Sequence, residues 1–324
     1  MRILLTGAAG FIGSQVAHRL LEAGHFVYGL DNLNDYYSPA LKRHRLSALE
    51  RHPNFRFFAS DLADWPTMQA VFAAVAPIDA VMNLAARAGV RASLADPLVY
   101  HHTNATGSLH LLELMRRYGV PRYVLASTSS LYAGSDLPFT EDRPVNTPIS
   151  PYAASKKAAE VMAYTYHYHY GLDVAILRYF TVYGPAGRPD MSIFRFIEWI
   201  YRQQPVQLYG DGRQSRDFTY VEDVARATVA ALQVSGYHIL NVGGGRSPTS
   251  LLEVIAFIEK RLGKKAHLTQ EPFPRADILH TQADISHTTA LLGWKPEVDF
   301  WEGLERTLQW HLAHRDLLDS LALP

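Results

Sequence analysis

A glycine-rich turn directly after the first apolar segment restricts the fold of this chain more than any other feature. Residues 2–6 have the pattern of a short β-strand and run into Gly7, Gly10 and Gly13, which open a helix. Glycines at this spacing permit a sharp turn, a close approach of the backbone to a ligand, and tight packing of helix against strand. Because the first turn of a helix offers free N–H groups and partial positive charge, this segment predicts a diphosphate site.

The alternation of strands and helices after this turn predicts an α/β fold with a doubly wound parallel sheet. Strands are expected at 2–6, 26–31, 55–60, 80–85, 123–127 and 173–179, and helices at 66–75, 99–118 and 151–170. Short β-rich runs between helical patterns are typical of a parallel sheet with helices on both faces. We therefore assign residues 1–180 to a dinucleotide-binding domain, to which residues 236–262 are expected to return.

The pattern loosens after residue 180. Pro and Gly become frequent, and short strands are expected at 206–209, 238–242 and 266–269, with a helix at 221–234. No linker separates this part from the first. We expect residues 181–324 to form mainly a smaller substrate-binding region that shares a cleft with the first domain.

Charge and composition exclude several classes of protein. The 324 residues include 31 basic and 31 acidic side chains and no Cys. This balance argues against a nucleic-acid partner, which requires clustered excess Lys and Arg, and the lack of Cys excludes disulfides and thiolate metal sites. The apolar N-terminal run is too short for a signal peptide or a membrane span. We expect a cytoplasmic protein with no membrane partner.

Asp31 indicates which dinucleotide is bound. It ends the second expected strand, where a carboxylate accepts both hydroxyls of the adenine ribose and repels a 2′-phosphate, so we expect NAD rather than NADP. Asp61 and Leu62 follow the third strand and suit the adenine edge. The other expected cofactor contacts lie in the glycine turn, after the second strand and at the end of the fourth: Phe11, Ile12, Asn32, Leu84, Ala85 and Ala86.

A Tyr and a Lys one helical turn apart are the candidate catalytic pair. Tyr152 and Lys156 share one face of the expected helix at 151–170. A nearby Lys favours the phenolate and lowers the pKa of a Tyr toward that of a general base. A hydroxyl-rich run that includes Thr128 ends the fifth strand, and ligands of such sheets bind at the carboxyl ends of strands. A hydroxyl placed there can share the proton of a substrate.

These features together resemble the extended short-chain dehydrogenase/reductase superfamily, and specifically its nucleotide-sugar epimerases and dehydratases. Four segments are similar to the UDP-glucuronate 4-epimerases, namely 31–37, 86–91, 178–191 and 216–221. The resemblance covers essentially the whole chain. It implies a Rossmann-type fold, tightly held NAD, and 4-epimerisation of a UDP-hexuronic acid through a 4-keto intermediate.

The resemblance also implies roles for individual residues. Tyr152 is the expected base, Lys156 is expected to bind the nicotinamide ribose, and Thr128 is expected to hydrogen-bond the 4-hydroxyl of the sugar. The residues expected beside the UDP portion are Tyr209, Arg216 and Asp277. Thr181 and Arg188 are expected to line the sugar pocket. Apart from the resemblance, the cluster of hydroxyls suggests that Ser127, Ser129, Ser130 and Thr181 donate hydrogen bonds to the carboxylate of the uronic acid there.

Other activities on the same scaffold remain open from the sequence. Related dehydratases carry Asp-Glu directly after the Thr, and UDP-glucuronate decarboxylases have Glu where this chain has Ser130. The chain therefore lacks the second acid that elimination or decarboxylation needs. A 4-epimerase of a neutral sugar such as UDP-glucose is the main alternative. A non-catalytic NAD-binding protein is disfavoured because Thr128, Tyr152 and Lys156 are all present.

Three further patterns concern metal binding, solvent exposure and the oligomeric state. The pairs His101–His102 and His167–His169 lack the spacing of metal ligands, so no metal site is expected. The run Lys42–Arg45 is interpreted as a solvated face, and the tyrosines at 164–170 as the exposed end of a helix. In relatives that helix and the one around 109–115 form a four-helix dimer contact, so the resemblance implies a homodimer.

Overall fold

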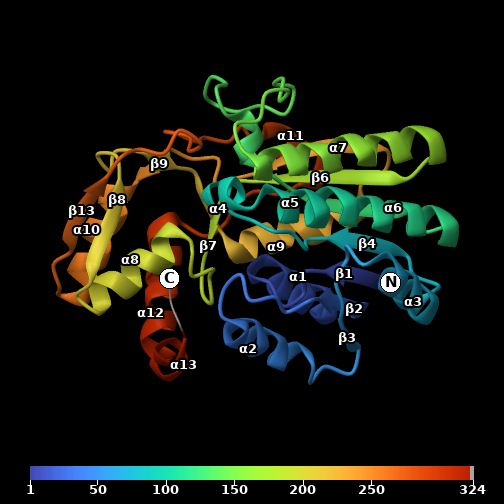
Figure 1. The fold of residues 1–324 in the computed structure, drawn as a ribbon, viewed down its shortest axis with the longest axis horizontal. Helices are drawn as coiled ribbons and strands as arrows, with labels where there is room; N and C mark the ends of the chain where they lie inside the picture. Colours follow the sequence, from blue (N-terminus) through green and yellow to red (C-terminus); the bar gives the residue numbers. More distant parts are fainter. Residues whose placement is uncertain (322–324) are drawn as a thin grey trace.

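A seven-stranded parallel sheet forms the centre of the computed structural model, which describes residues 1–321 (Figure 1). The strand order is β11-β6-β5-β4-β1-β2-β3. The order reverses between β1 and β4, and ligands of such sheets bind in the crevice at this point. The expected doubly wound α/β fold is confirmed. The strands are β1 (Arg2–Thr6), β2 (Phe26–Asp31), β3 (Phe55–Ala59), β4 (Ala80–Asn83), β5 (Arg122–Thr128), β6 (Asp173–Tyr179) and β11 (Tyr237–Val242).

Both faces of the sheet are buried because its strands are apolar at successive positions, and successive side chains point to opposite faces. In β1, Ile3 and Leu5 pack into one layer and Leu4 into the other. On the first side lie α1 (Phe11–Glu22), α2 (Pro39–Leu49) and α9 (Val221–Ala230), and on the second α3 (Trp65–Val75), α6 (Gly107–Tyr118) and α7 (Pro151–Tyr170) (Figure 1).

Local signals at its two ends fix the long helix α7. The Ser150 hydroxyl caps the first turn by accepting from the backbone N–H of Ala153 at 3.2 Å, and Pro151 occupies the first helical position. Gly171 ends the helix in the left-handed conformation, with φ +68°. The expected bounds 151–170 are confirmed.

The helix expected at 99–118 is divided into three pieces. α5 (Pro97–Tyr100) leads into a π-helical turn at His101–Thr106, and α6 follows. Such turns are rare and often lie beside functional sites. Residues 101–108 are almost entirely polar or small, so the spacing of apolar residues gives no signal there and does not reveal the change of winding.

The C-terminal residues build a smaller part beside the carboxyl edge of the sheet. Its core joins α8 (Ser192–Tyr201), β8 (Pro205–Tyr209), α10 (Leu251–Leu262), β13 (His267–Glu271) and α12 (Phe300–Ala313). The remaining short elements are α4 (Val90–Ala95), β7 (Thr181–Tyr183), β9 (Ser215–Arg216), β10 (Phe218–Tyr220), β12 (Thr249–Ser250), α11 (Ser286–Leu292), α13 (Arg315–Ser320) and 3-10 turns at Ser129–Tyr132 and Ala231–Gln233.

The two parts are interwoven along the chain. β11 lies in the large sheet beside β6, and α9 packs against α1, although both follow the start of the smaller part in sequence. α10, in contrast, packs against α8 in the smaller part. The chain crosses between the two parts several times, so their relative position is held by several connections.

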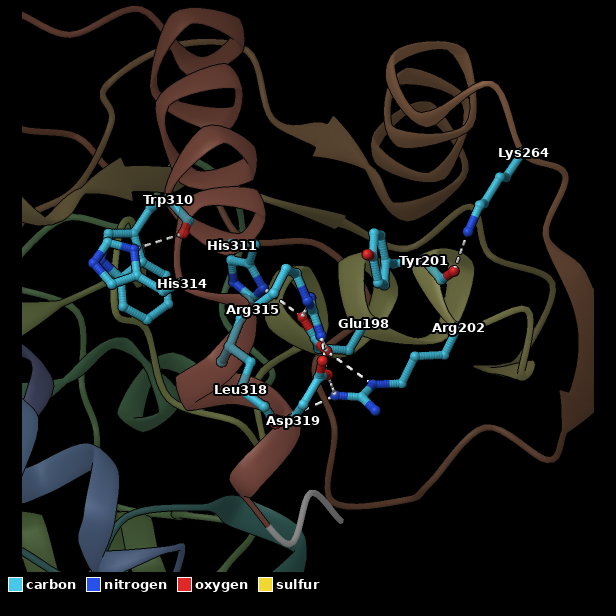
Figure 2. A network of polar contacts seen from close by, with 10 residues as sticks. All are labelled: Glu198, Tyr201, Arg202, Lys264, Trp310, His311, His314, Arg315, Leu318 and Asp319. Carbon is cyan, nitrogen blue, oxygen red and sulfur yellow. Dashed lines mark hydrogen bonds and ion pairs between the residues drawn. The ribbon is translucent and has the colours of Figure 1, made fainter.

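A buried carboxylate anchors the C-terminal helices (Figure 2). Glu198 on α8 accepts hydrogen bonds from Arg315 at 2.8 and 3.0 Å, and the ring of His311 lies 2.8 Å from the same carboxylate. Arg202 joins the cluster at 3.1 Å from Glu198 and 2.6 Å from Asp319. These contacts tie α12 and α13 to α8, which follows the loop that carries Arg188.

Candidate active site

A cavity of about 320 Å³ lies at the carboxyl ends of the central strands, between the large sheet and the smaller part. The glycine turn lines one end, and the loop after β6 and the end of β5 line the other. Asp31 is the only carboxylate in its lining within residues 1–321. The cavity therefore has the position expected for a dinucleotide with a second ligand beside it.

The glycine turn has no room for side chains. A Cβ on Gly13 would lie 2.0 Å from the carbonyl oxygen of Gly7, and one on Gly10 would lie 2.9 Å from that oxygen. The first turn of α1 has no side-chain cap, so its N–H groups stay available. These features fit a diphosphate held against the helix N-terminus. Phe11 and Ile12 also line the cavity.

Asp31 is buried at the end of β2 and has a basic partner. Its carboxylate lies 3.8 Å from Lys42 Nζ and accepts a hydrogen bond from the backbone N–H of Leu33 at 2.8 Å. Both Asp31 and Lys42 line the cavity. The Asp31 carboxylate therefore lies where it could accept hydrogen bonds from the adenine ribose of a dinucleotide.

The interpretation of Lys42–Arg45 as a solvated face is wrong for two of its residues. Lys42 and Arg45 are each 5% exposed. Arg45 donates to the carbonyl oxygens of Ala186 and Gly187 at 2.7 and 2.9 Å. It thereby joins α2 to the loop that carries Arg188. A run of charges in one segment cannot reveal partners that lie far along the chain.

The other residues expected to contact the cofactor, Asp61 and Leu62 at the adenine edge among them, divide into two groups. Asn32, Leu62, Leu84, Ala85 and Ala86 line the cavity, whereas Asp61 is not among the lining residues. The Asp61 carboxylate accepts from the side-chain amide of Asn32 at 2.8 Å and from the backbone N–H of Ala63 at 2.9 Å. Asp61 therefore contacts the site through Asn32.

Tyr152, Lys156 and Thr128 all line the cavity, and the Thr128 hydroxyl lies beside the Tyr152 phenol. Burial raises the pKa of Tyr152, and the Thr128 hydroxyl beside it partly opposes this rise. Burial lowers the pKa of Lys156 to about 8, and the charge of Glu160 opposes this fall. Lys156 Nζ donates to the carbonyl oxygen of Ala126 at 2.8 Å, which fixes the ammonium behind β5.

Thr128 is oriented by the backbone that follows it. Its Oγ1 accepts from the N–H of Ser130 at 3.1 Å, so its own hydroxyl proton remains free to donate. This arrangement places a phenol, a hydroxyl and a buried ammonium together. Chemically, the three groups can hold and move one proton at a substrate hydroxyl.

All five residues expected around the sugar line the cavity, but two of them already have partners. Ser129, Ser130, Thr181 and Arg188 line it, and Arg188 is held by Asp190 through two contacts of 3.0 and 2.6 Å. Ser127 also lines the cavity, but its hydroxyl donates to Glu160 at 2.6 Å. Ser127 therefore does not have the free proton that its expected contact with a substrate carboxylate needs.

The residues expected beside UDP lie outside the lining of the main cavity and form their own cluster. Arg91 of α4 lies over the ring of Tyr209 at 4.0 Å and 3.9 Å from the Asp277 carboxylate. Burial lowers the pKa of Arg216, and the charge of Asp277 opposes this fall. Val90, adjacent to Arg91, lines the main cavity. The cluster is therefore linked to the cavity through the start of α4.

Several site residues were not identified from the sequence. Tyr36 and Arg87 line the cavity, and the Tyr36 hydroxyl donates to Asp190 at 3.2 Å. Arg91 and Asp190 add the contacts described above. All four lie in segments 31–37, 86–91 and 178–191, which carry the resemblance, so membership of these segments was the available signal.

Residues 1–321 contain neither a membrane-spanning helix nor a cluster of metal ligands. No helix there is long and apolar enough to cross a membrane. The same residues contain no group of three or more His, Cys, Asp or Glu side chains arranged to hold a metal ion.

Comparisons with known proteins agree with this geometry. The family model described as NAD dependent epimerase/dehydratase family matches residues 3–243. A UDP-glucuronate 4-epimerase of Thermodesulfobacterium geofontis is 52% identical over 318 residues, which cover 98% of each protein.

Two solved structures extend these comparisons. The UDP-glucuronic acid 4-epimerase of Bacillus cereus, in complex with UDP-glucuronic acid and NAD, is 35% identical, with a TM-score of 0.90, over 97% of this chain and 99% of that one. The UDP-glucose 4-epimerase of Thermotoga maritima, with UDP-glucose, is 31% identical, with a TM-score of 0.89, over 97% and 100%.

Proposed function

Because this chain belongs to the NAD dependent epimerase/dehydratase family, we propose that it is an NAD-dependent UDP-glucuronate 4-epimerase. It interconverts UDP-glucuronate and UDP-galacturonate. The observation that carries the proposal is the cavity lining, where Tyr152, Lys156 and Thr128 lie with the hydroxyls of Ser129, Ser130 and Thr181, and where Asp31, at the end of β2, is the one acidic side chain among the described residues 1–321.

The cofactor is NAD. The glycine turn would hold its diphosphate and Asp31 its adenine ribose, and the free N–H groups and the lack of room for side chains fit that binding. When bound, NAD accepts the hydride from carbon 4 of the sugar and returns it to the opposite face.

The side chains of this chain handle the proton. Tyr152 accepts the proton of the 4-hydroxyl while the hydride leaves carbon 4, and it returns the proton to the oxygen after the keto sugar has turned over. Lys156 stabilises the phenolate by its positive charge, and Thr128 donates a hydrogen bond to the reacting oxygen. No net oxidation results.

The rim of the cavity suits the carboxylate of a uronic acid. A 4-keto uronate is a β-keto acid, which loses carbon dioxide when its carboxylate bond aligns with the carbonyl π system. Hydrogen bonds from Ser129, Ser130 and Thr181 to the charged carboxylate would keep it out of that alignment. Arg188 supplies a nearby positive charge.

The outer cluster would bind the nucleotide. The Tyr209 ring would lie against uracil, while Arg216 and Asp277 would contact the UDP portion. Arg91 supports this role because it holds both Tyr209 and Asp277 from the first domain.

The test is direct. Purified protein is incubated separately with UDP-glucuronate and UDP-glucose without added cofactor, and products are identified by NMR. We expect conversion of the acid alone, by NAD that stays bound through purification. Conversion of UDP-glucose alone would support the neutral-sugar alternative. Formation of UDP-xylose would support a decarboxylase, and inertness toward both substrates would contradict the proposal.

We further propose a homodimer in the cytoplasm. Large apolar side chains are exposed on neighbouring helices, including Leu98 on α5 (79% exposed) and Tyr168 on α7 (71% exposed), together with Val161 and Tyr164. Tyr166, in the same aromatic run, is instead buried and donates to Glu113. Exposed apolar groups on adjacent helices support a contact between copies of the chain.

A further inference from the structure

A buried carboxylate that the proposed mechanism does not use lies directly behind the catalytic pair. Glu160 follows Lys156 by one turn of α7 and is 1% exposed. A carboxylate in such a place is costly unless charged and hydrogen-bonded partners compensate it. Its partners therefore indicate what it does.

Arg178 of β6 supplies the opposite charge. Its Nε donates to Glu160 Oε1 at 3.0 Å and its Nη2 to Oε2 at 2.8 Å, which is a bidentate geometry. The remaining guanidinium nitrogen of Arg178, Nη1, donates to the Tyr132 hydroxyl at 2.9 Å. The pair joins α7 to β6 and to the turn that follows Thr128.

Ser127 of β5 completes the set. Its hydroxyl donates to Glu160 Oε1 at 2.6 Å, and successive side chains of a strand point to opposite faces, so Ser127 and Thr128 are directed apart. One residue earlier, the Ala126 carbonyl accepts from Lys156 at 2.8 Å. The end of β5 is thus held to α7 at two consecutive residues, by two side chains one helical turn apart.

We propose that Glu160 is a positioning residue for the epimerisation. Its carboxylate holds β5 against α7 so that Thr128 and Lys156 meet Tyr152, and it supplies the negative charge that faces the Lys156 ammonium. This inference rests on the proposed function of the same site.

The charged and titratable groups around Glu160 come from four elements. Arg178 faces it from β6, Lys157 from its own helix at 3.7 Å, Tyr132 from the turn after β5, and Tyr237 from β11. Lys157 approaches from the solvent side. For Lys156, Glu160 is the charge that favours the protonated form against burial.

The decisive variant is Glu160→Gln, which keeps the shape and an acceptor for Ser127 but removes the charge. Lys156 then loses its proton at lower pH. We expect kcat to fall roughly ten- to a hundredfold, because Lys156 without the opposing charge is more easily deprotonated and then no longer stabilises the Tyr152 phenolate. KM for UDP-glucuronate is expected to change by less than about threefold, and the alkaline limb of the kcat profile to move to lower pH.

Two companion variants separate charge from position. Ser127→Ala keeps the ion pair but frees the end of β5, so kcat falls while the alkaline limb stays in place. Lys157→Gln removes a cation from the same carboxylate without touching β5, and it is expected to leave both kcat and the limb unchanged.

The variant Glu160→Gln leaves the Arg178 guanidinium without its counter-charge and can fail to fold. The double variant Glu160→Gln/Arg178→Gln removes both buried charges and is measured in parallel, with thermal unfolding and bound NAD as readouts of the fold. We expect the alkaline limb of the kcat profile of this double variant to lie at lower pH than in the wild type as well. If neither variant folds, Ser127→Ala decides the inference through its kcat.

The outcomes distinguish the two proposals. A folded variant without the Glu160 charge that keeps the wild-type alkaline limb, or a Ser127→Ala variant with wild-type kcat, overturns the role of Glu160 while leaving the epimerase assignment intact. A wild-type protein inert toward UDP-glucuronate overturns the proposed function, and the role of Glu160 with it.

Discussion

Burial acts on Tyr152 and Lys156 in opposite directions. It raises the pKa of the phenol and lowers that of the ammonium to about 8, so in each residue the neutral form is favoured. A base in this position therefore depends on the remaining charges and hydrogen bonds around it. Thr128 and Glu160 provide these within the chain.

Replacing the proposed base tests this account. Tyr152→Phe removes the hydroxyl that exchanges the proton, and we expect kcat to fall by about 10²- to 10⁴-fold. The ring remains, so thermal unfolding and bound NAD are expected to match the wild type. Product formation from UDP-glucuronate, followed by NMR, gives kcat. A variant with near wild-type kcat would exclude Tyr152 as the base.

The hydroxyl-rich rim makes a prediction about products. Ser130→Glu introduces an acid beside Thr128, and Thr181→Ala removes a donor to the substrate carboxylate. In both variants we expect part of the 4-keto intermediate to lose carbon dioxide, which gives a xylose-type product. NMR of the product mixture measures the fraction. If both variants still form only the epimer, the rim does not protect the carboxylate.

At the scale of elements, Glu198 determines how α12 and α13 pack on α8 (Figure 2). Burial alone raises its pKa, but hydrogen bonds from His311 and Arg315 outweigh burial and lower the pKa to about 2. Burial lowers the pKa of His311, and the hydrogen bond and charge of Glu198 oppose this fall. Glu198 stabilises the fold fully above its ordinary pKa of 4.5, and this contribution is lost as pH falls toward 2.

We therefore expect Glu198→Gln to lower the free energy of unfolding at pH 7 by about 1 to 3 kcal/mol, because the charged hydrogen bonds from Arg315 are weakened while Arg315 keeps Asp319 as a second partner at 2.8 Å. The difference in free energy of unfolding between the variant and the wild type becomes smaller as pH falls below 4.5, because the wild type then loses the contribution of Glu198. Urea unfolding at several pH values measures this difference. The matched change Glu302→Gln removes an exposed partner of Arg306 and is expected to cost under about 1 kcal/mol. Equal effects of the two changes would refute the role of Glu198.

At the scale of the whole molecule, the exposed apolar face of α7 predicts the oligomeric state. We expect a homodimer in sedimentation at micromolar concentration. Val161→Asp places a charge in the proposed contact and should give a monomer. Leu291→Asp, at an exposed apolar position on α11, should remain a dimer. A monomeric wild-type protein, or dimers in both variants, would refute the contact.

The whole molecule is divided into two domains, and each contains segments from separate parts of the chain. We propose that residues 1–180 with β11 and α9 act as the NAD-binding unit, since both elements pack on the large sheet or its helices. The α10 segment packs with α8 in the substrate-binding part. Sequence order does not reveal this exchange, because the helices of both parts have similar amphipathic patterns.

What the sequence determined is local or repeated along the chain. The glycine turn, the alternating strands, Asp31 at the end of β2, and Tyr152 one turn before Lys156 all follow from spacing, because neighbours in a strand or helix have fixed relative positions. The large-sheet strand bounds differ by no more than two residues from those expected.

Only the tertiary structure decided which distant groups meet. It buried Lys42 beside Asp31, joined Arg91 to Tyr209 and Asp277, and turned the Ser127 hydroxyl from the expected substrate toward Glu160. Each contact joins separate elements, and burial gives each charge a partner that spacing cannot specify. The desolvation cost of a buried charge depends on the whole fold, so these partners are settled only when the fold is complete.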